Sequence, residues 1–540
     1  MKVAVIGGYG VFGARLVRLL SRDGHEVIVV GRNAAKATAL AAEVGASSLA
    51  LDMRGDLAPL FAADPDAVVD AAGPYQAYGN DPYRLARTAI AYGAHYLDLS
   101  DDAAFTAGIG MLNDAAVAAG VFALSGASSA PGLSSVVVDT LREGLTGIEL
   151  IDVAILPGNR APRGRSVMAS ILGQIGAPLV LRRGGADHAS ANWSGRRRYR
   201  LAPGLVRDGW LISVPDVRLF PDHFDARSVT FRAGLELPVM NWGLVMLRWL
   251  RRLGLPFRGH WFVSLMMRLA NLLRPLGSDR GGMVVEVLGR DKHGIMRRRR
   301  WTLIAEEGEG PFIPAVTARA ILRAAETIRA GARPCLGEVK LAAAERAMDD
   351  LAVTAQREDS AAPALFEARL GHDYARLPAA VRQVHDLWDR GALTGRARVD
   401  RGRGTAARLV GALFGFPAAS DDVPVTVTMV REGRTERWTR RFDGKPFHSV
   451  LWRASDGEMR ERFGPLSFQL DLSVEDGALR FPVSRGWCFG IALPRILLPV
   501  SETRESAEEG VFHFDVALWM PLRLGLIVRY RGWLKPDGDH

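Results

Sequence analysis

The stretch VAVIGGYGVFGARLVRLL, residues 3–20, decides the fold of the N-terminal part of the chain. A strand-like apolar run leads into Gly8-x-Gly10-x-x-Gly13, and a helical pattern follows, which is the context that a dinucleotide-binding fingerprint requires. Glycines at these positions allow a tight turn, a close approach of backbone amides to a pyrophosphate, and close packing of helix on strand. We therefore predict a Rossmann domain whose first loop binds the cofactor phosphates through Gly7, Gly8, Gly10, Val11, Phe12 and Gly13.

Short apolar runs alternate with helical patterns over residues 1–125, which indicates right-handed crossovers and a parallel sheet. The predicted strands are Lys2–Ile6, Glu26–Val30, Ser48–Leu51, Ala67–Ala71, Tyr96–Leu99 and Val121–Leu124. The predicted helices are Val11–Arg22, Ala34–Val44, Pro82–Tyr92 and Asn113–Ala119, and a further helix opens at Pro131.

The end of the second strand, VIVVGRN, predicts the type of cofactor. An NAD-binding domain usually carries Asp or Glu here, where the carboxylate binds the ribose 2′-hydroxyl. This chain has Gly31 and Arg32 instead, and a guanidinium can pair with a 2′-phosphate. We therefore predict NADP as the cofactor. Asp52, after the third strand, is predicted either to contact the adenine or to cap the next segment.

Polar residues follow the fourth and fifth strands at the edge where doubly wound sheets bind ligands. We predict that Ala72, Gly73 and Pro74 lie beside the nicotinamide ribose. The predicted catalytic residues are Tyr75, Asp98 and Ser100. Carboxylates and serines at such positions can also simply cap helices, so that alternative stays open.

The sequence divides into several segments with different patterns. We predict a Rossmann domain over residues 1–140 and a second, mixed α/β domain over 141–335, with a largely antiparallel sheet and an amphipathic helix over 314–330, which the family resemblance given below implies to be the helix that returns to the Rossmann domain. A helix and linker follow over 336–363. Residues 364–540 show many short strand signals separated by turns such as Asp476–Gly477, which predicts a mostly antiparallel β-sheet or barrel with some helix.

Residues 239–277 are rich in Leu, Met and Trp, with interspersed arginines, and predict two helices broken at Gly254–Pro256. One interpretation is a buried hairpin or a homodimer contact. The other is an anchor lying in the plane of a membrane surface, with an apolar body and Arg258 among the cationic groups that reach the headgroups. The arginines sit too centrally for a bilayer-spanning helix.

The composition limits the remaining possibilities. With 48% hydrophobic and 24% charged residues, the chain is typical of a folded globular protein. The net charge of +10 is spread along the chain without an RNA-binding motif, so no nucleic-acid partner is expected. Two distant cysteines, Cys335 and Cys488, predict neither a disulfide scaffold nor a metal site, and a reducing compartment fits. We expect a cytoplasmic protein, with peripheral membrane attachment as the open alternative.

Several of these motifs together resemble the saccharopine dehydrogenase-like oxidoreductases over about residues 1–335. The motifs are GGYGVFG, VVGRN, AAGPYQAYG, GAHYLDLSDD and GPFIPAVTARAIL. The resemblance implies NADP(H)-linked hydride transfer to or from a carbonyl, imine or amine, without naming the substrate. The C-terminal motifs, among them ERWTRRFDGKPFHS and MRERFGPLSFQL, resemble a bacterial domain of uncharacterised function.

Three functions are therefore weighed. The first is an NADP-dependent oxidoreductase. The second is a non-catalytic NADP-binding sensor or scaffold at a membrane surface. The third is a binding protein for a lipid or acidic ligand, in which the C-terminal domain does the binding.

Overall fold

The computed structural model describes residues 1–162, 164–255 and 259–537. The chain forms two compact units, Met1–Ser360 and Ala361–His540. Arg258 and Pro256, named above in the predicted helical pair, lie outside the described residues.

In the described part of the first unit, seven strands form a parallel sheet in the order β15-β6-β5-β4-β1-β2-β3. The strands are β1 (Lys2–Ile6), β2 (Glu26–Gly31), β3 (Ser47–Ala50), β4 (Ala67–Asp70), β5 (His95–Asp98), β6 (Phe122–Ser125) and β15 (Gly331–Pro334). The helices are α1 (Gly13–Arg22), α2 (Ala34–Val44), α3 (Ala58–Phe61), α4 (Arg84–Ala91), α5 (Ala103–Gly108), α6 (Asn113–Ala118), α7 (Ser134–Leu141), α12 (Ile313–Arg323) and α13 (Leu341–Arg346). This confirms the predicted doubly wound Rossmann sheet, whose usual strand order begins 3-2-1-4-5-6.

The central strands β1, β2 and β4 are mostly apolar and buried because helices cover both faces of the sheet, whereas the edge strand β3 is mostly exposed. Along β1, Val3 and Val5 belong to one core cluster, whereas Ala4 and Ile6 belong to another. Successive strand side chains point to opposite faces, so these two clusters are the two covered sides of the sheet.

A second sheet of seven described strands has the order β10-β11-β12-β7-β13-β14-β16. Its members are β7 (Leu145–Leu156), β10 (Arg197–Ala202), β11 (Leu205–Leu211), β12 (Val229–Ala233), β13 (Gly281–Asp291), β14 (Met296–Ala305) and β16 (Val353–Ala361). A hairpin of β8 (Pro178–Arg183) and β9 (Ala186–Ala191) and the helices α8 (Arg165–Gln174), α9 (Pro215–His223), α10 (Pro238–Arg252) and α11 (His260–Leu272) accompany it. The pairs β10–β11, β11–β12, β7–β13 and β13–β14 are antiparallel and the pair β7–β12 is parallel, which fits the predicted, largely antiparallel sheet.

The structure contradicts the predicted division into segments in two places. Residues 331–334, placed with the second domain, form β15 and pair with β6 of the Rossmann sheet. The predicted linker contains β16, whose Asp359 forms ion pairs with Arg297 and Arg299 at N–O distances of 2.8 and 3.2 Å. A strand held by backbone pairing and exposed ion pairs carries little apolar periodicity, and so its sequence resembles a linker.

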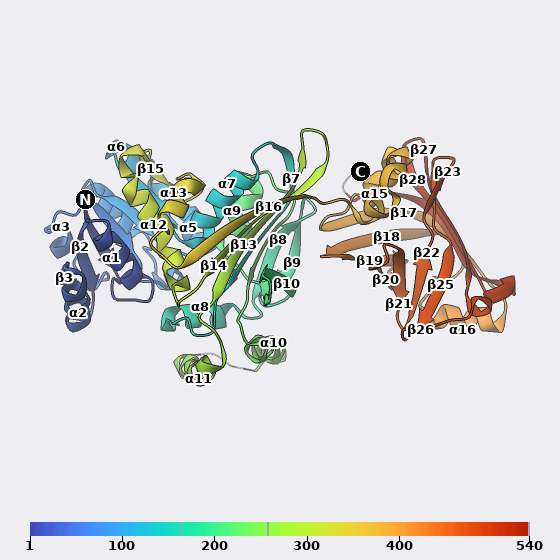
Figure 1. Cartoon of the computed structure of the whole chain (residues 1–540), viewed down its shortest axis with the longest axis horizontal. Coiled ribbons are helices and arrows are strands. Elements are labelled where there is room, and N and C mark those ends of the chain that lie inside the picture. Colours follow the sequence, from blue (N-terminus) through green and yellow to red (C-terminus); the bar gives the residue numbers. More distant parts are fainter. Residues whose placement is uncertain (163, 256–258, 538–540) are drawn as a thin grey trace. The chain divides into compact units, whose positions relative to one another are not determined.

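In the second unit, thirteen of the described strands form one sheet in the order β23-β24-β27-β28-β29-β17-β18-β19-β20-β21-β22-β25-β26, and all twelve neighbouring pairs are antiparallel. The strands are β17 (Arg390–Arg401), β18 (Ser420–Glu432), β19 (Thr435–Phe442), β20 (Lys445–Arg453), β21 (Met459–Phe463), β22 (Leu466–Leu470), β23 (Ser473–Glu475), β24 (Ala478–Arg480), β25 (Val483–Cys488), β26 (Ile491–Ala492), β27 (Val500–Glu508), β28 (Val511–Trp519) and β29 (Leu526–Pro536). The helices are α14 (Leu365–Leu370), α15 (Ala379–His385) and α16 (Thr405–Leu413). The sheet curves strongly (Figure 1), and the predicted antiparallel C-terminal domain is confirmed.

Candidate functional site

The glycine loop between β1 and α1 is built by close backbone contacts. Gly7 has a φ of +70°, and a Cβ at this residue would lie 2.8 Å from the Cα of Ala72. A Cβ at Gly13 would lie 2.3 Å from the carbonyl oxygen of Gly7. The loop therefore holds the first turn of α1 against the end of β1, with Phe12 as its N-cap. The first N–H groups of a helix have no partner within it and form a ready site for phosphate.

The end of β2 lies beside this loop and is organised by a tyrosine. The ring of Tyr9 covers Gly31, where a Cβ would lie 2.3 Å from the ring. The Tyr9 hydroxyl accepts a hydrogen bond from the backbone N–H of Asn33 at 3.0 Å. Arg32 is exposed, and within the described residues it forms no ion pair or side-chain hydrogen bond. Its guanidinium is thus available to an anion at the end of β2.

Asp52 and the loop after β4 lie at the same edge of the sheet. Asp52 is exposed, and its carboxylate accepts a hydrogen bond from the backbone N–H of Arg54 at 3.1 Å, which stabilises a local turn. The backbone N–H of Ala72 donates to Asp70 at 2.9 Å, and the partly exposed residues Gly73 and Pro74 follow. Contacts of Asp52 and of Ala72–Pro74 with a cofactor stay predictions.

Two of the three predicted catalytic residues, Tyr75 and Ser100, form side-chain hydrogen bonds to backbone groups. The Tyr75 hydroxyl donates to the carbonyl oxygen of Asp70 at 2.8 Å and accepts from the N–H of Leu99 at 3.1 Å, so it joins the ends of β4 and β5. The Ser100 hydroxyl accepts from the N–H of Asp102 at 3.1 Å, just before α5. Both side chains are buried. These bonds give each residue a structural task, and their catalytic roles stay predictions.

Asp98 is the most unusual of the predicted residues. It is fully buried at the end of β5, and its Oδ1 accepts hydrogen bonds from the Ser100 N–H, the Ser125 hydroxyl and the Gly126 N–H, at 3.0, 3.0 and 2.8 Å. Among the described residues, Oδ2 is buried and has no hydrogen-bond partner. Burial raises the pKa of Asp98 to about 7, although the three donors act to lower it. The carboxyl group can therefore hold a proton near neutral pH.

A second carboxyl group at this edge was not predicted. Asp70, at the end of β4, is fully buried, and its Oδ2 accepts a hydrogen bond from the Tyr78 hydroxyl at 2.9 Å. Burial raises the pKa of Asp70 to about 6, and burial together with Asp70 raises the pKa of the half-buried Tyr78 well above its ordinary value. Tyr78 is in the quoted motif AAGPYQAYG, but nothing in its spacing indicates that the loop folds back to place it on Asp70. We call Asp70, Tyr78 and Asp98 the carboxyl cluster.

The helical pair of the second domain carries apolar side chains on two faces. Leu247 of α10 and Phe262 of α11 pack into a small core with Trp193 and Trp210. The opposite side presents large side chains at helical spacing, each at least 41% exposed. This outer apolar face consists of Trp242, Met246, Trp249 and Leu253 on and after α10, and Trp261, Leu265, Leu269 and Leu272 on α11. No helix in the described part of the chain is both long enough and apolar enough to cross a bilayer.

Comparison with known proteins identifies the N-terminal domain. Residues 3–124 match the model of the saccharopine dehydrogenase NADP binding domain. This part of the chain is such a domain. A domain of this type suggests an NAD(P)-dependent oxidoreductase, and the glycine loop and Arg32 lie within it. Residues 377–534 match a domain of unknown function, DUF4166, which corresponds to most of the second unit.

Solved structures include more distant similarities. Apo saccharopine dehydrogenase (L-Glu forming) from Saccharomyces cerevisiae is 16% identical, with a TM-score of 0.46, over 66% of this chain and 99% of that one. A probable dehydrogenase from Thermotoga maritima is 10% identical, with a TM-score of 0.32, over 64% of this chain and 93% of that one. No curated protein matches the chain. TM-scores below 0.5 carry no conclusion about substrate.

Proposed function

We propose that the protein is an NADP(H)-dependent oxidoreductase that transfers hydride to or from a carbonyl, imine or amine substrate. The exposed Arg32 carries the choice of NADP over NAD. It follows Gly31 at the end of β2, where an acidic side chain would repel a 2′-phosphate, and it has no partner within the described residues. An exposed arginine without a protein partner is suited to a bidentate contact with phosphate.

Two features of the first loop support the fit of a dinucleotide. The contact between Gly13 and Gly7 leaves no room for a side chain, so backbone N–H groups rather than side chains face the phosphate position. In this proposal Gly7–Gly13 hold the pyrophosphate, Arg32 binds the 2′-phosphate and Ala72–Pro74 border the nicotinamide ribose. When bound, the cofactor supplies or accepts the hydride.

Reduction of a carbonyl or imine also needs one proton for each hydride. The half-buried Tyr78 is the member of the carboxyl cluster with an exposed part, and Asp70 fixes the position of its hydroxyl. We assign to Tyr78 the hydrogen bond to the substrate oxygen or nitrogen. The single hydroxyl hydrogen of Tyr78 is free for this bond when Asp70 is protonated and donates to Tyr78 instead of accepting from it. Asp70 and Asp98 hold a proton near pH 6–7. A group whose pKa lies close to the working pH is the most effective acid or base.

Nucleotide binding tests the proposal. Loss of a charged pair with the 2′-phosphate should weaken NADPH binding by about 10–100-fold in an Arg32→Ala variant, and NADH binding should change little. Arg434→Ala is the matched control, because this arginine is also exposed but lies in the turn between β18 and β19. Equal weakening of both nucleotides by Arg32→Ala would contradict the assignment. If neither nucleotide binds the wild type, the oxidoreductase proposal fails.

Turnover separates this proposal from a non-catalytic sensor. We expect oxidation of NADPH by at least one member of a panel of aldehydes, ketones and ketone–amine mixtures. The decrease of absorbance at 340 nm measures the reaction. Tight NADPH binding with no turnover on any member of the panel, at any pH between about 5 and 8, favours the sensor.

We further propose that α10 and α11 attach the protein to an anionic membrane surface. The outer apolar face is flanked by arginines, and residues 239–277 contain no acidic side chain. Tryptophan and arginine on an apolar helix surface suit the boundary between headgroups and acyl chains. A protein partner would more often meet so basic a segment with its own acidic residues, whereas an anionic bilayer supplies negative charge over the whole face.

Co-sedimentation with phosphatidylglycerol vesicles tests the membrane proposal. Wild type should sediment with these vesicles and should bind phosphatidylcholine vesicles less. Trp249/Trp261→Ser should reduce binding about tenfold or more, because two boundary side chains are lost. Tyr92/Met111→Ser is the control, since these side chains are equally exposed but lie in the Rossmann domain. Wild-type protein that stays in the supernatant removes the proposal.

A further inference from the structure

The curved sheet of the second unit encloses a cavity of about 330 Å³. Its walls come from strands that are far apart in the sheet order, among them β27, β28, β18, β19 and β22. The cavity therefore lies inside the curve of one sheet and needs no residue of the first unit. Its size is at the lower end of the range of about 300–1,000 Å³ found for small-molecule sites.

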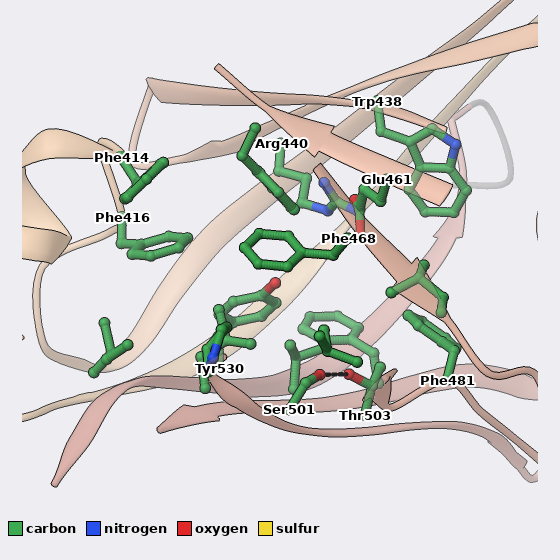
Figure 2. Close-up of a pocket in the computed structure, with 18 of the residues that line it drawn as sticks. Phe414, Phe416, Trp438, Arg440, Glu461, Phe468, Phe481, Ser501, Thr503 and Tyr530 are labelled. Atoms are coloured by element: carbon green, nitrogen blue, oxygen red, sulfur yellow. Dashed lines mark hydrogen bonds and ion pairs between the residues drawn. The ribbon is translucent and has the colours of Figure 1, made fainter. Parts of the chain in front are cut away.

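Strand alternation makes the cavity apolar. Along β28 every second residue faces inward, namely Phe512, Phe514, Val516 and Leu518. The residues between them include His513 and Asp515, which do not line the cavity. Aromatic rings from other elements complete the lining, and Figure 2 shows Phe414, Phe416, Phe468 and Phe481 around the same space. A hollow lined in this way favours an apolar occupant.

A few polar groups occupy two opposite walls (Figure 2). On one wall, Arg440 faces Glu461 at an N–O distance of 3.5 Å and donates to the Ser449 hydroxyl at 2.8 Å. On the other wall, the hydroxyl groups of Ser501 and Thr503 lie 3.1 Å apart on β27.

Two carboxyl groups, those of Glu461 and Glu505, contribute to the charge of the cavity wall. Glu505, next along the inner face of β27, lies 2.6 Å from the Nε2 atom of the buried His385. Glu461 is 7% exposed, and within the described residues its Oε1 has no hydrogen-bond partner. Among the described residues Arg440 is the only arginine or lysine that lines the cavity, and it is balanced by Glu461, while Glu505, which also lines the cavity, is bonded to His385.

We propose that this cavity binds a neutral, mainly apolar small molecule that carries a hydroxyl group. The apolar walls hold its hydrocarbon body. The hydroxyl donates to Oε1 of Glu461, which lies 3.5 Å from the Arg440 guanidinium but accepts no hydrogen bond within the described residues, or bonds to Ser501 and Thr503. A ligand with a carboxylate is disfavoured, because Arg440 is already neutralised and Glu505 adds negative charge. An unpaired charge in an apolar cavity is costly, whereas a hydroxyl with a partner is not.

Binding of the neutral dye N-phenyl-1-naphthylamine to the full chain tests the cavity. Dye fluorescence should rise on binding. Val516→Trp fills the cavity from β28 and should weaken binding about tenfold or more, since little free volume remains. His513→Trp places the same side chain on the outer face of the same strand and should leave binding unchanged. Val427→Phe, on β18, replaces Val516→Trp if that variant does not fold. Equal dye binding by wild type and a folded cavity-filling variant would overturn the proposal.

Competition with two ligands of equal chain length tests the charge argument. Dodecan-1-ol should displace the dye about tenfold more effectively than dodecanoate at pH 8, because the carboxylate has no free cation to pair with. Glu461→Gln leaves Arg440 unbalanced and should reduce this preference by improving dodecanoate. A wild-type preference for dodecanoate, or a preference for the alcohol that Glu461→Gln leaves unchanged, would refute the assignment of a neutral ligand.

Discussion

The buried carboxyl group of Asp98 should make the first unit less stable as the pH rises. In the folded protein the pKa of Asp98 is about 7, whereas an unfolded chain has the ordinary value of about 3.8. The folded state therefore binds the proton more tightly. Its stabilising effect is complete below pH 4 and is lost progressively as the pH rises through 7.

The size of the effect follows from the two pKa values. Between pH 5 and pH 8, this one group should lower the free energy of unfolding by about 2.5 kcal/mol. Asp98→Asn removes the titration and keeps an oxygen that can accept from Ser100, Ser125 and Gly126. The first unit spans Met1–Ser360, so its unfolding entropy is large, and 2.5 kcal/mol corresponds to a shift of about 3 °C in Tm.

Scanning calorimetry of the full chain at pH 5, 6, 7 and 8 measures this difference. The Tm of one transition should fall about 3 °C further in wild type than in Asp98→Asn over this range. Asp70 and Asp216 also have raised pKa values because they are buried. Asp216 should titrate equally in both proteins, whereas Asp70 interacts with Asp98, as the last and smallest cause of the raised Asp98 pKa, and so adds a smaller difference of its own. Asp114→Asn, at an exposed carboxyl group in the same domain, should behave as wild type. If Asp98→Asn shows the wild-type pH dependence, Asp98 does not hold a proton near neutral pH.

Two further variants test the loop and the carboxyl cluster. Gly13→Ala places a Cβ 2.3 Å from the Gly7 oxygen, so it should weaken NADPH binding about tenfold or more and lower the Tm. Gly110→Ala, where the added Cβ meets nothing within 4 Å, should do neither, and titration with NADPH compares the two. Tyr78→Phe should lower kcat about 10–100-fold on any substrate found, change the pH profile, and leave the KM for NADPH unchanged. An unaltered pH profile, or the same loss in Tyr92→Phe, would remove Tyr78 from the reaction.

The parallel sheet could be predicted because its signal is local. Val3–Ile6 is an uninterrupted apolar run followed by glycines, and the structure has the predicted strand Lys2–Ile6 with the same bounds. Asp98 could also be placed, since a polar residue at the end of a buried parallel strand lies at the ligand-binding edge. Its free Oδ2 atom could not be predicted, because the number of donors depends on how the loop at Ser125 and Gly126 folds over it.

Features that depend on contacts between residues far apart in the sequence could not be predicted from local sequence patterns. The ring of Tyr9 on Gly31 depends on the turn of a loop, and the pairing of β15 with β6 uses only backbone groups. The cavity of the second unit depends on the curvature of the whole sheet. Period-2 alternation along β28 predicts two faces, but it does not show that one face closes around a hollow.

The position of the buried carboxyl groups, which lower the stability of the fold at neutral pH, is itself an argument for function. A carboxyl group that is buried with an oxygen lacking a partner destabilises the fold at neutral pH, and an asparagine could make the same backbone contacts without that cost. In this chain Asp70 and Asp98 end adjacent parallel strands, and both pKa values are raised toward neutral pH. This is the edge at which doubly wound sheets bind their ligands. A pair of groups able to hold a proton at pH 6–7 at this edge supports the proposed oxidoreductase over the passive nucleotide sensor, because hydride transfer to a carbonyl or imine also requires a proton and nucleotide binding does not.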